Sequence, residues 1–532
     1  MRFWQNPEFM RHLRSQLRPA RALAIAAVVV IVCVLVWMGC WGSQQAQLDA
    51  AHRWAAEHLP TQNPGYWAER VKYLEEHFVK NVALSCFEWL LGIQAIVLTF
   101  WSLAACAQSV LGERDRKTWD FQRVTRLTSG EIVIGKLLGE PVLAYFIFLC
   151  SLPASLIAGA AGGVSPTNLF AMYAVLIANA LFLGLGGLWL STMMEARSRG
   201  LFVIGALSLL AFSGLSIPFY ESHFPGLAAF SPYMEIGSRL NGFSRSPSLS
   251  TLFGQEVSWA TMSLLLYVTF GAWLALVLVR NIKRDHPDLR PFTRWQVLAF
   301  AAFLNFLIYG LFRSNTDLVD APNVTTSLQL ATYATTMNWI ILFIVGLATL
   351  SPRERLKIWW RKRTSGHVGL LSDEGLPWPW IALSAAIAYL LMFWGLLAWR
   401  HALAFDSDSL KTASVMVLAI AVFVIRDILF LQWCILTRLR APVMKGLMYL
   451  CLYYIGALII GGLFFGYSEG SDEGVLMLFT PSGVFDSKVV GAHFPTMFYA
   501  GLAIQVGVIA VISLAISKRL SRAPVVPALA TT

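Results

Sequence analysis

The sequence predicts an all-α membrane protein that crosses the bilayer about twelve times, as two halves of six helices each. Three observations carry this prediction. Of the 532 residues, 57% are hydrophobic and 13% are charged, which is more apolar surface than a soluble core of this size needs. The apolar residues gather in runs long enough to cross about 30 Å of hydrocarbon. The basic residues gather in the loops on one side of those runs.

Each run of roughly 18 or more mostly apolar residues is expected to form a transmembrane helix. The approximate ranges are 22–42, 84–110, 141–162, 168–191, 201–218, 258–279, 295–312, 328–350, 378–399, 411–436, 446–466 and 496–516. The first run is expected to be a retained span, because no small-residue cleavage site follows it. The outer loop at 43–83 is rich in aromatic and charged residues, which favours two short amphipathic helices covering the outer face.

Lysine and arginine set the expected orientation. With twelve spans, 30 of the 41 basic residues fall on the side that holds the N-terminus and ten fall on the other side. Basic loops remain on the cytoplasmic side, so both termini are expected in the cytoplasm and the protein in the cell (inner or plasma) membrane. The net charge of +11 is therefore a topology signal that suits anionic inner-leaflet lipid, and it indicates no nucleic-acid partner.

Residues 1–20 are expected to form an amphipathic helix that lies flat on the inner membrane surface. Asn6 suits the N-cap and Pro7 suits the first helical position. One face carries Phe9, Leu13 and Leu17, and another carries Arg11, Arg14 and Arg18.

A weak internal repeat divides the rest of the chain. The matching pieces are LRP at 17–19 and 289–291, FSP at 230–232 with FTP at 479–481, and Trp189 with Trp433. The expected halves are therefore residues 21–284 and 285–522, followed by a disordered tail at 523–532. The alternative is that these triplets match by chance.

The longest basic stretch of the first half is the cytoplasmic segment 112–136, GERDRKTWDFQRVTRLTSGEIVIGK. Within it, Gly130, Gly135 and Lys136 have nearly the spacing of a phosphate-binding loop. Leu137 stands where such a loop needs a Ser or Thr for Mg²⁺, and Glu131 would repel a phosphate. The chain is therefore expected to have no ATPase site of its own and not to be an enzyme.

The same residues suit the start of a helix. Thr128 or Ser129 can serve as the N-cap, with Glu131 two or three residues later. Glu131 and Lys136 are then expected to be polar contacts at the helix start and on its flank. The alternative is a solvated basic loop whose arginines only set the topology.

Segment 112–136 resembles the cytoplasmic segment of the ABC type-2 permeases, the membrane subunits of ATP-driven exporters. The shared pattern is E-R-x-x-x-T-x-[DE], then L-[ST]-x-x-E-I-x-x-G-K. The matching residues are Glu113, Arg114, Thr118, Asp120, Leu127, Thr128, Glu131, Ile132, Gly135 and Lys136, and Ser129 lies beside them. Where the family usually has Gly before the Thr and Pro before the L-[ST], this chain has Lys117 and Arg126.

The resemblance implies that the chain is the permease of an ABC exporter in a fused, two-half form. Segment 112–136 would be a coupling helix that docks into a cleft of a separate ATPase subunit, which binds ATP and Mg²⁺. Segment 351–377 of the second half keeps Arg-Glu-Arg but lacks E-I-x-x-G-K, so unequal engagement of two ATPase subunits is expected. No cofactor is expected in this chain, and the transported substrate is not readable.

Three charged residues inside the expected spans are candidates for a transport or gating site, because charges in hydrocarbon are costly: Glu88, Arg426 and Asp427. Side chains adjacent on a helix point about 100° apart, so Arg426 and Asp427 are each expected to pair with another helix. These residues leave two alternatives open, an ion-gradient-driven secondary transporter and a membrane-embedded enzyme or scaffold. No metal site or disulfide is expected, because the seven cysteines lie within spans and form no CxxC motif.

Overall fold

The structure is a computed structural model of the whole chain. It describes residues 6–58, 64–119, 127–193, 229–232, 250–253, 255–282, 292–311, 324–398, 407–437, 442–465, 480 and 496–521. The chain divides into two compact units, Met1–Pro291 and Phe292–Thr532. The boundary expected at 284/285 lies outside the described residues.

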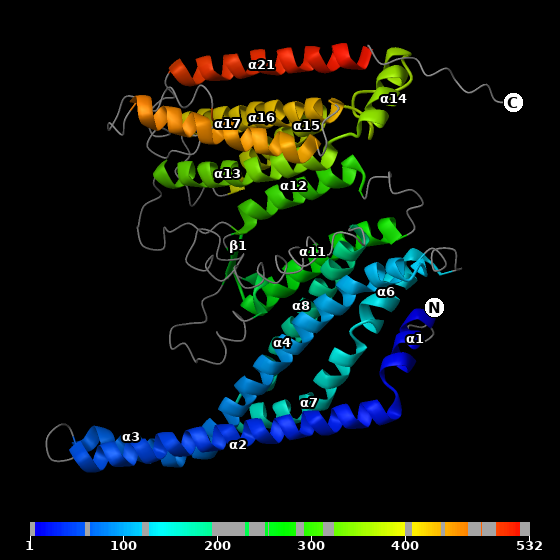
Figure 1. The fold of residues 1–532 in the computed structure, drawn as a ribbon. Helices are drawn as coiled ribbons and strands as arrows, with labels where there is room; N and C mark the ends of the chain where they lie inside the picture. Colours follow the sequence, from blue (N-terminus) through cyan, green and yellow to red (C-terminus); the bar gives the residue numbers. More distant parts are fainter. Residues whose placement is uncertain are drawn as a thin grey trace. The chain divides into compact units, whose positions relative to one another are not determined.

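The first unit is helical apart from one short hairpin (Figure 1). Its helices are α1 (Pro7–Gln16), α2 (Pro19–His58), α3 (Pro64–Glu76), α4 (Phe78–Asp115), α6 (Ser129–Gly139), α7 (Val142–Ala161), α8 (Pro166–Met193) and α11 (Trp259–Ile282). Strands β1 (Ser250–Leu252) and β2 (Gln255–Val257) pair antiparallel, with Thr251 opposite Glu256.

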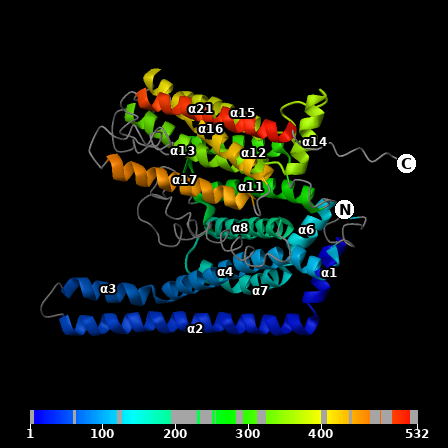
Figure 2. The ribbon, with the colours of Figure 1, turned by 45° about the horizontal axis from the view of Figure 1, so that its top comes forward.

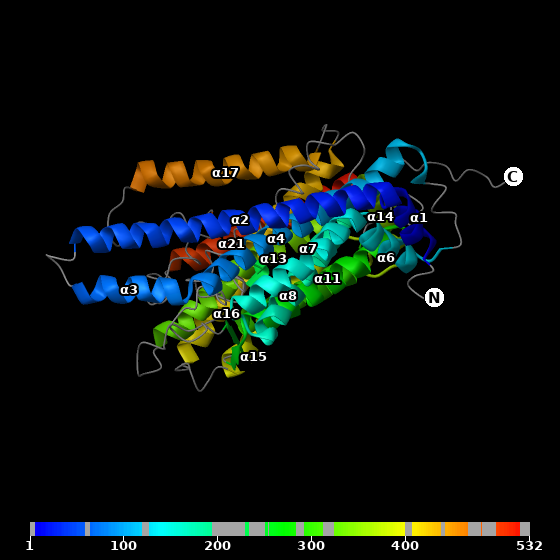
Figure 3. The same ribbon diagram turned by 90° about the horizontal axis from the view of Figure 1, so that it is seen from below.

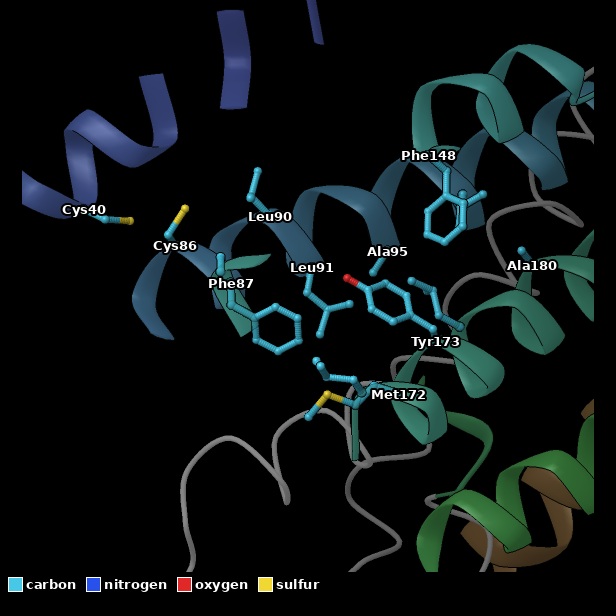
Figure 4. Packing of buried hydrophobic residues seen from close by; sticks show 14 of the residues in the cluster. Cys40, Cys86, Phe87, Leu90, Leu91, Ala95, Phe148, Met172, Tyr173 and Ala180 are labelled. Carbon is cyan, nitrogen blue, oxygen red and sulfur yellow. The ribbon is translucent and has the colours of Figure 1, made fainter. Parts of the chain in front are cut away.

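Helix α4 is the centre of the first unit and packs against α8, α7 and α2. Close approach of α8 depends on glycine, because a Cβ on Gly187 would lie 2.7 Å from the carbonyl oxygen of Leu103 on α4. At the other end of α4, Phe87 and Leu91 are buried beside Met172 of α8 (Figure 4). Among the described helices of the first unit, α4 therefore contributes the most buried apolar side chains.

The outer part of the first unit differs from the expectation of short helices covering the outer face. Helix α2 continues without a break to His58, and α3 lies alongside it (Figures 2 and 3). One short helix, α3, therefore forms in the described part of the 43–83 segment, and the long helices α2 and α4 supply most of its other residues. No break is needed because no proline interrupts residues 20–58.

The second unit consists of seven described helices. They are α12 (Arg294–Leu311), α13 (Val324–Thr349), α14 (Arg353–Thr364), α15 (Trp378–Ala398), α16 (Ser407–Leu436), α17 (Pro442–Phe465) and α21 (Thr496–Ser521). Helix α16 is central and packs against α13, α15, α17 and α21. Helix α14 turns away from α13 by 83°, so the chain leaves the direction of the bundle there.

Within the described parts of the chain, nine helices are long and apolar enough to cross a membrane, and the bent pair α13 and α14 makes a tenth candidate. Of the twelve expected spans, eleven coincide with helices, among them α13 and α17. The fifth, at 201–218, lies outside the described residues. The prediction of an all-α polytopic membrane protein is confirmed.

Candidate coupling site

The coupling segment begins where α4 ends in a turn around Lys117. The Lys117 amide donates to the Arg114 carbonyl at 3.1 Å, and the Thr118 amide donates to the Glu113 carbonyl at 2.9 Å. This pair of bonds is a Schellman motif, which places Lys117 in the left-handed region with φ of +56°. A side chain there costs about 1 kcal/mol relative to glycine. Lys117 thus replaces the usual glycine while the glycine-type turn is kept.

Helix α6 begins at a capping box. Thr128 is the N-cap, and its hydroxyl accepts from the Glu131 amide at 3.3 Å. The Glu131 carboxylate accepts in return from the Thr128 amide at 2.8 Å. Of the two candidate caps, the structure selects Thr128. Glu131 is therefore occupied in holding the helix start, where its charge also favours the helix dipole.

Lys136 lies on the buried face of α6 rather than on an accessible flank. Its side chain is 0% exposed and donates to Glu113 at 2.7 Å and to Ser109 at 3.1 Å, both on α4. The Lys136 ammonium also lies 5.7 Å from the centre of the Trp119 ring. The expectation that Lys136 is a flank contact was wrong. The segment's apolar Ile132 and Val133 bury the same face of α6, which carries the lysine in with them.

Helix α1 covers another face of α6. The Asn6 side chain caps α1 by accepting from the Glu8 and Phe9 amides, and it donates to the Glu131 carbonyl at 2.8 Å. Close packing requires glycine on α6, because a Cβ on Gly135 would lie 2.7 Å from Glu8 Cβ. Gly139 similarly faces His12. The two glycines are four residues apart and so share a face of the helix.

A charged cluster joins α1, α4 and α6. Glu113 accepts from Lys136 and also from Arg11 of α1 at 3.0 Å, and Arg11 lies 2.9 Å from Glu8. We call these four residues the charged clamp. Because Lys136 is buried and doubly bonded, its ammonium is compensated where it would otherwise be costly. The roles of Arg11 and Ser109 could not be recognised in the sequence, because Arg11 is one of several arginines in its segment and Ser109 is one of several polar residues in α4.

Two more titratable groups border the charged clamp. His12 lies 3.6 Å from Glu140 and 3.7 Å from Glu8. Burial, together with the positive charges of Arg11 and Lys136, lowers the pKa of His12 to about 4, against a smaller opposite effect of Glu8 and Glu113. Burial also raises the pKa of Glu140. At neutral pH His12 is therefore uncharged, and its contacts with the carboxylates are not ion pairs.

The exposed part of the site is small. It consists of Asp115, Arg116, Lys117, Thr118, Thr128 and Ile134, which we call the rim. Of the other expected coupling residues, Glu113, Gly135 and Lys136 are buried, Arg114, Ser129 and Glu131 are half-buried, and Asp120 lies outside the described residues. Arg114 donates to the Thr192 carbonyl of α8 at 3.2 Å. Most of the described residues of the matching pattern are therefore buried or half-buried, and they support a short exposed surface.

This arrangement of α1, α4 and α6 lies inside a region that matches a known family. Residues 8–234 match the family model of the ABC-2 type transporter. This match supports the resemblance of this part of the chain to the ABC type-2 permeases. No curated protein and no solved structure matches the chain. The ABC-2 match ends before the second unit begins, so the second unit is described from its own contacts.

In the second unit, Arg294 holds the segment between α13 and α15. Its guanidinium is 1% exposed and donates to the carbonyls of Thr349, Ser372 and Gly375 and to the Ser351 hydroxyl. The Arg294 amide donates to Asp373 at 3.1 Å. In the sequence Arg294 looked like one more basic residue ahead of a span. Its partners are mostly backbone carbonyls, which every residue has, so the residue types did not indicate this role.

Helix α14 anchors the rest of that segment. Leu356 and Trp359 are buried against α16 and α21, and the Trp359 indole donates to the Gly369 carbonyl at 3.4 Å. Trp359 is 1% exposed and lies in the core under α14. The exposed face of α14 carries Arg361 and Lys362.

The intramembrane candidates differ from one another. Arg426 donates to Asp427 through Nε at 2.8 Å and through Nη2 at 2.7 Å, so these neighbours do pair with each other. Their mutual contact was not expected from the angle between adjacent side chains, and it forms because the long arginine side chain folds back. The expected pairing of each residue with another helix is confirmed. Arg426 also donates to Gln505 of α21 at 2.6 Å, and Tyr454 of α17 donates to Asp427 at 2.6 Å. Glu88 is exposed on α4 and belongs to no such cluster.

Proposed function

We propose that this chain is the permease of an ABC exporter and that the rim receives a separate ATPase subunit. The observation that carries this proposal is the charged clamp, which ties α6 to α1 and to the spanning helix α4. A push on the rim would move α4 directly, because Lys136 and Glu113 join the two helices through a buried 2.7 Å contact. Such a buttressed segment suits the transfer of movement better than a solvated loop does.

The second unit supports a second, weaker contact. Segment 351–377 is also buttressed, by Arg294 and by the buried side of α14, and its accessible face is basic. It lacks the capping box and paired glycines of α6. We therefore propose that two ATPase subunits engage the chain unequally and that each binds ATP with Mg²⁺.

The secondary-transport alternative has less support. It requires an ionisable group in the membrane that can exchange an ion or a substrate. Asp427 is 2% exposed and is bonded to Arg426 and Tyr454, which makes it a link between α16 and α17. An enzyme would need a paired acid and base gathered in a pocket near one surface. Outside the charged clamp the described residues include the pair His52 and Glu75, which lies exposed on α2 and α3.

The proposal is tested by charge reversal at the rim. The tagged chain is purified from its native membrane in mild detergent, and the co-purifying ATP turnover is measured. Arg116→Glu/Lys117→Glu is expected to lower the co-purified ATPase at least tenfold. Both residues are exposed, so this variant leaves the charged clamp intact. Lys136→Ala is unsuitable here, because it would disturb the buried contacts of α6.

Arg70→Glu/Lys72→Glu is the matched control, because it reverses two exposed charges on α3. It is expected to retain the ATPase. Arg361→Glu/Lys362→Glu on α14 reports on the second contact, where a smaller loss supports unequal engagement. If the wild-type chain carries no ATPase, or if the rim variant keeps as much as the α3 control, the proposal fails.

A further inference from the structure

A hollow of about 490 Å³ lies between α2, α4 and α7 of the first unit. Its volume falls within the roughly 300–1,000 Å³ of ligand sites. The lining is almost wholly aliphatic and aromatic, and it includes Val28 and Val29 of α2, Leu90 and Trp101 of α4, and Ile147 and Phe148 of α7. We call this hollow the α2 groove. Nothing in the coupling site uses it.

The α2 groove exists because α2 leaves the bundle toward its N-terminal end. Cys40 of α2 lies beside Cys86 of α4 (Figure 4), and Cys33 and Val36 pack against the same cluster. Toward Pro19 the two helices separate (Figures 1 and 2). The inner half of α2 is therefore apolar without being packed; its Val28 is 58% exposed.

The length of the α2 groove suits one acyl chain. The lining residues of α2 run from Arg21 to Cys33, which spans about 18 Å at 1.5 Å per residue. One leaflet of the hydrocarbon core is about 15 Å thick, half of the whole. The groove thus reaches from the membrane surface to about the bilayer centre.

The polar side chains at the deep end of the α2 groove are already hydrogen-bonded within the protein. Gln94 and Ser151 line it, but the Gln94 amide donates to Ser151 at 2.9 Å and to Ser155 at 3.0 Å. The Gln94 carbonyl oxygen accepts from Tyr173 at 3.3 Å. Since these groups satisfy one another, a methyl terminus placed against them leaves no buried polar atom unpaired.

The shallow end of the α2 groove is basic. Arg21 lines it, is exposed, and has no hydrogen bond or ion pair among the residues that the structure describes. Arg14 and Arg18 precede it, and the first turn of α2 contains no acidic residue. A basic mouth on an apolar slot at the cytoplasmic surface matches a phosphate headgroup with its acyl chain.

We propose that the α2 groove binds an anionic phospholipid of the inner leaflet, with one acyl chain between α2, α4 and α7 and the phosphate at Arg21. The leaflet rests on the proposed topology, and the site is otherwise independent of any ATPase. An occupied groove supplies the packing that the inner half of α2 lacks, and it holds α2 next to α1 and the charged clamp.

The test uses native mass spectrometry of the full chain in detergent, with phosphatidylglycerol or phosphatidylcholine of identical acyl chains added. Val28→Trp fills the groove, and Ile31→Trp is its control, since Val28 and Ile31 are both 58% exposed on α2 and only Val28 lines the groove. Ile25→Trp is a second filling variant. We expect wild type and Ile31→Trp to retain one phosphatidylglycerol. In both filling variants the fraction of protein that retains this lipid is expected to fall at least fivefold.

The headgroup is tested by Arg21→Gln against Arg18→Gln. Arg21→Gln is expected to remove a preference of at least fivefold for phosphatidylglycerol over phosphatidylcholine, and Arg18→Gln is expected to change it less than twofold. Equal effects of the two arginine variants would show a diffuse surface charge and overturn the headgroup assignment. Equal lipid retention by Val28→Trp and Ile31→Trp, or no retained lipid on wild type, would overturn the site. Elution profiles and melting temperatures confirm that each variant is folded.

Discussion

At the scale of single residues, Glu113 is where the contacts of the coupling segment converge. It serves two cations, the fully buried Lys136 and the half-exposed Arg11. The two ends of the Lys136–Glu113 pair are therefore unequal. Loss of Glu113 leaves a buried ammonium with only the Ser109 hydroxyl and the Trp119 ring among its described contacts, whereas loss of Lys136 leaves a carboxylate that still has Arg11.

This asymmetry predicts the order of two variants. Glu113→Gln is expected to destabilise the protein by about 3–5 kcal/mol, as in other broken buried pairs, and Lys136→Met by less. The double variant is expected to regain part of the Glu113→Gln loss, because no unpaired charge remains. Melting temperatures of the detergent-purified proteins measure all four states. Equal destabilisation by the two single variants would contradict the charged clamp as described.

His12 predicts a pH dependence of the contact between α1 and α6. Its pKa is about 4 in the folded protein and near 6.5 when unfolded, so the folded state resists protonation. The contact is expected to be fully stable above pH 6.5 and to weaken as pH falls toward 4, by roughly tenfold in its opening equilibrium per pH unit. Hydrogen exchange of residues 6–16, corrected for the intrinsic rate, measures the opening.

His12→Gln is the control for this effect, because the pKa of the neighbouring Glu140 is shifted as well. The raised pKa of Glu140 acts in the opposite direction, since that carboxyl takes up its proton more readily in the folded state. The difference between wild type and His12→Gln isolates the histidine. If the opening of residues 6–16 depends on pH in the same way in wild type and in His12→Gln between pH 6.5 and 4, the prediction is contradicted.

At the scale of elements, the docking of α1 on α6 depends on one missing side chain. Gly135→Ala places a Cβ within 2.8 Å of both Glu8 and Asn6 and is expected to detach α1, raising hydrogen exchange in residues 6–16 about tenfold. Gly130→Ala is the matched control on the same helix, since its Cβ meets nothing within 4 Å. It is expected to leave hydrogen exchange in α1 unchanged and to stabilise α6, because alanine has a higher helix propensity than glycine. Similar exchange in the two variants would rule out the close packing.

The sequence predicted the elements better than their contacts. Apolar runs have the period and length of spans, and Asn6 and the Thr128 capping box follow local rules, so these features were readable. Lys136 was misplaced because a charged side chain looks exposed until its partner 23 residues earlier is brought beside it. Arg294 was missed for the same reason, with partners 55 to 82 residues away. Long-range pairing is not encoded in local pattern.

At the scale of the whole molecule, each unit has a cluster of apolar side chains beneath the segment that is expected to be cytoplasmic, 112–136 in the first unit and 351–377 in the second. Trp189 packs with Trp119 and Ile132 in the first unit, and Trp433 packs with Leu356 and Trp359 in the second. Trp189 and Trp433 are the residues that the weak sequence repeat aligns. This correspondence supports the proposed two-half organisation, in which both segments face the same side of the membrane.

That organisation gives the last prediction, which concerns orientation. If the basic loops are cytoplasmic, the end of α14 and the tip of α3 lie on opposite sides of the membrane. Ser365→Cys and Glu76→Cys place a thiol at exposed positions on these two elements. In intact cells a membrane-impermeant maleimide is expected to label Glu76→Cys above the wild-type background and to leave Ser365→Cys unlabelled. In inside-out vesicles the order is expected to reverse. Labelling of both thiols from one side would contradict the proposed topology. It would also contradict the placement of the α2 groove in the inner leaflet.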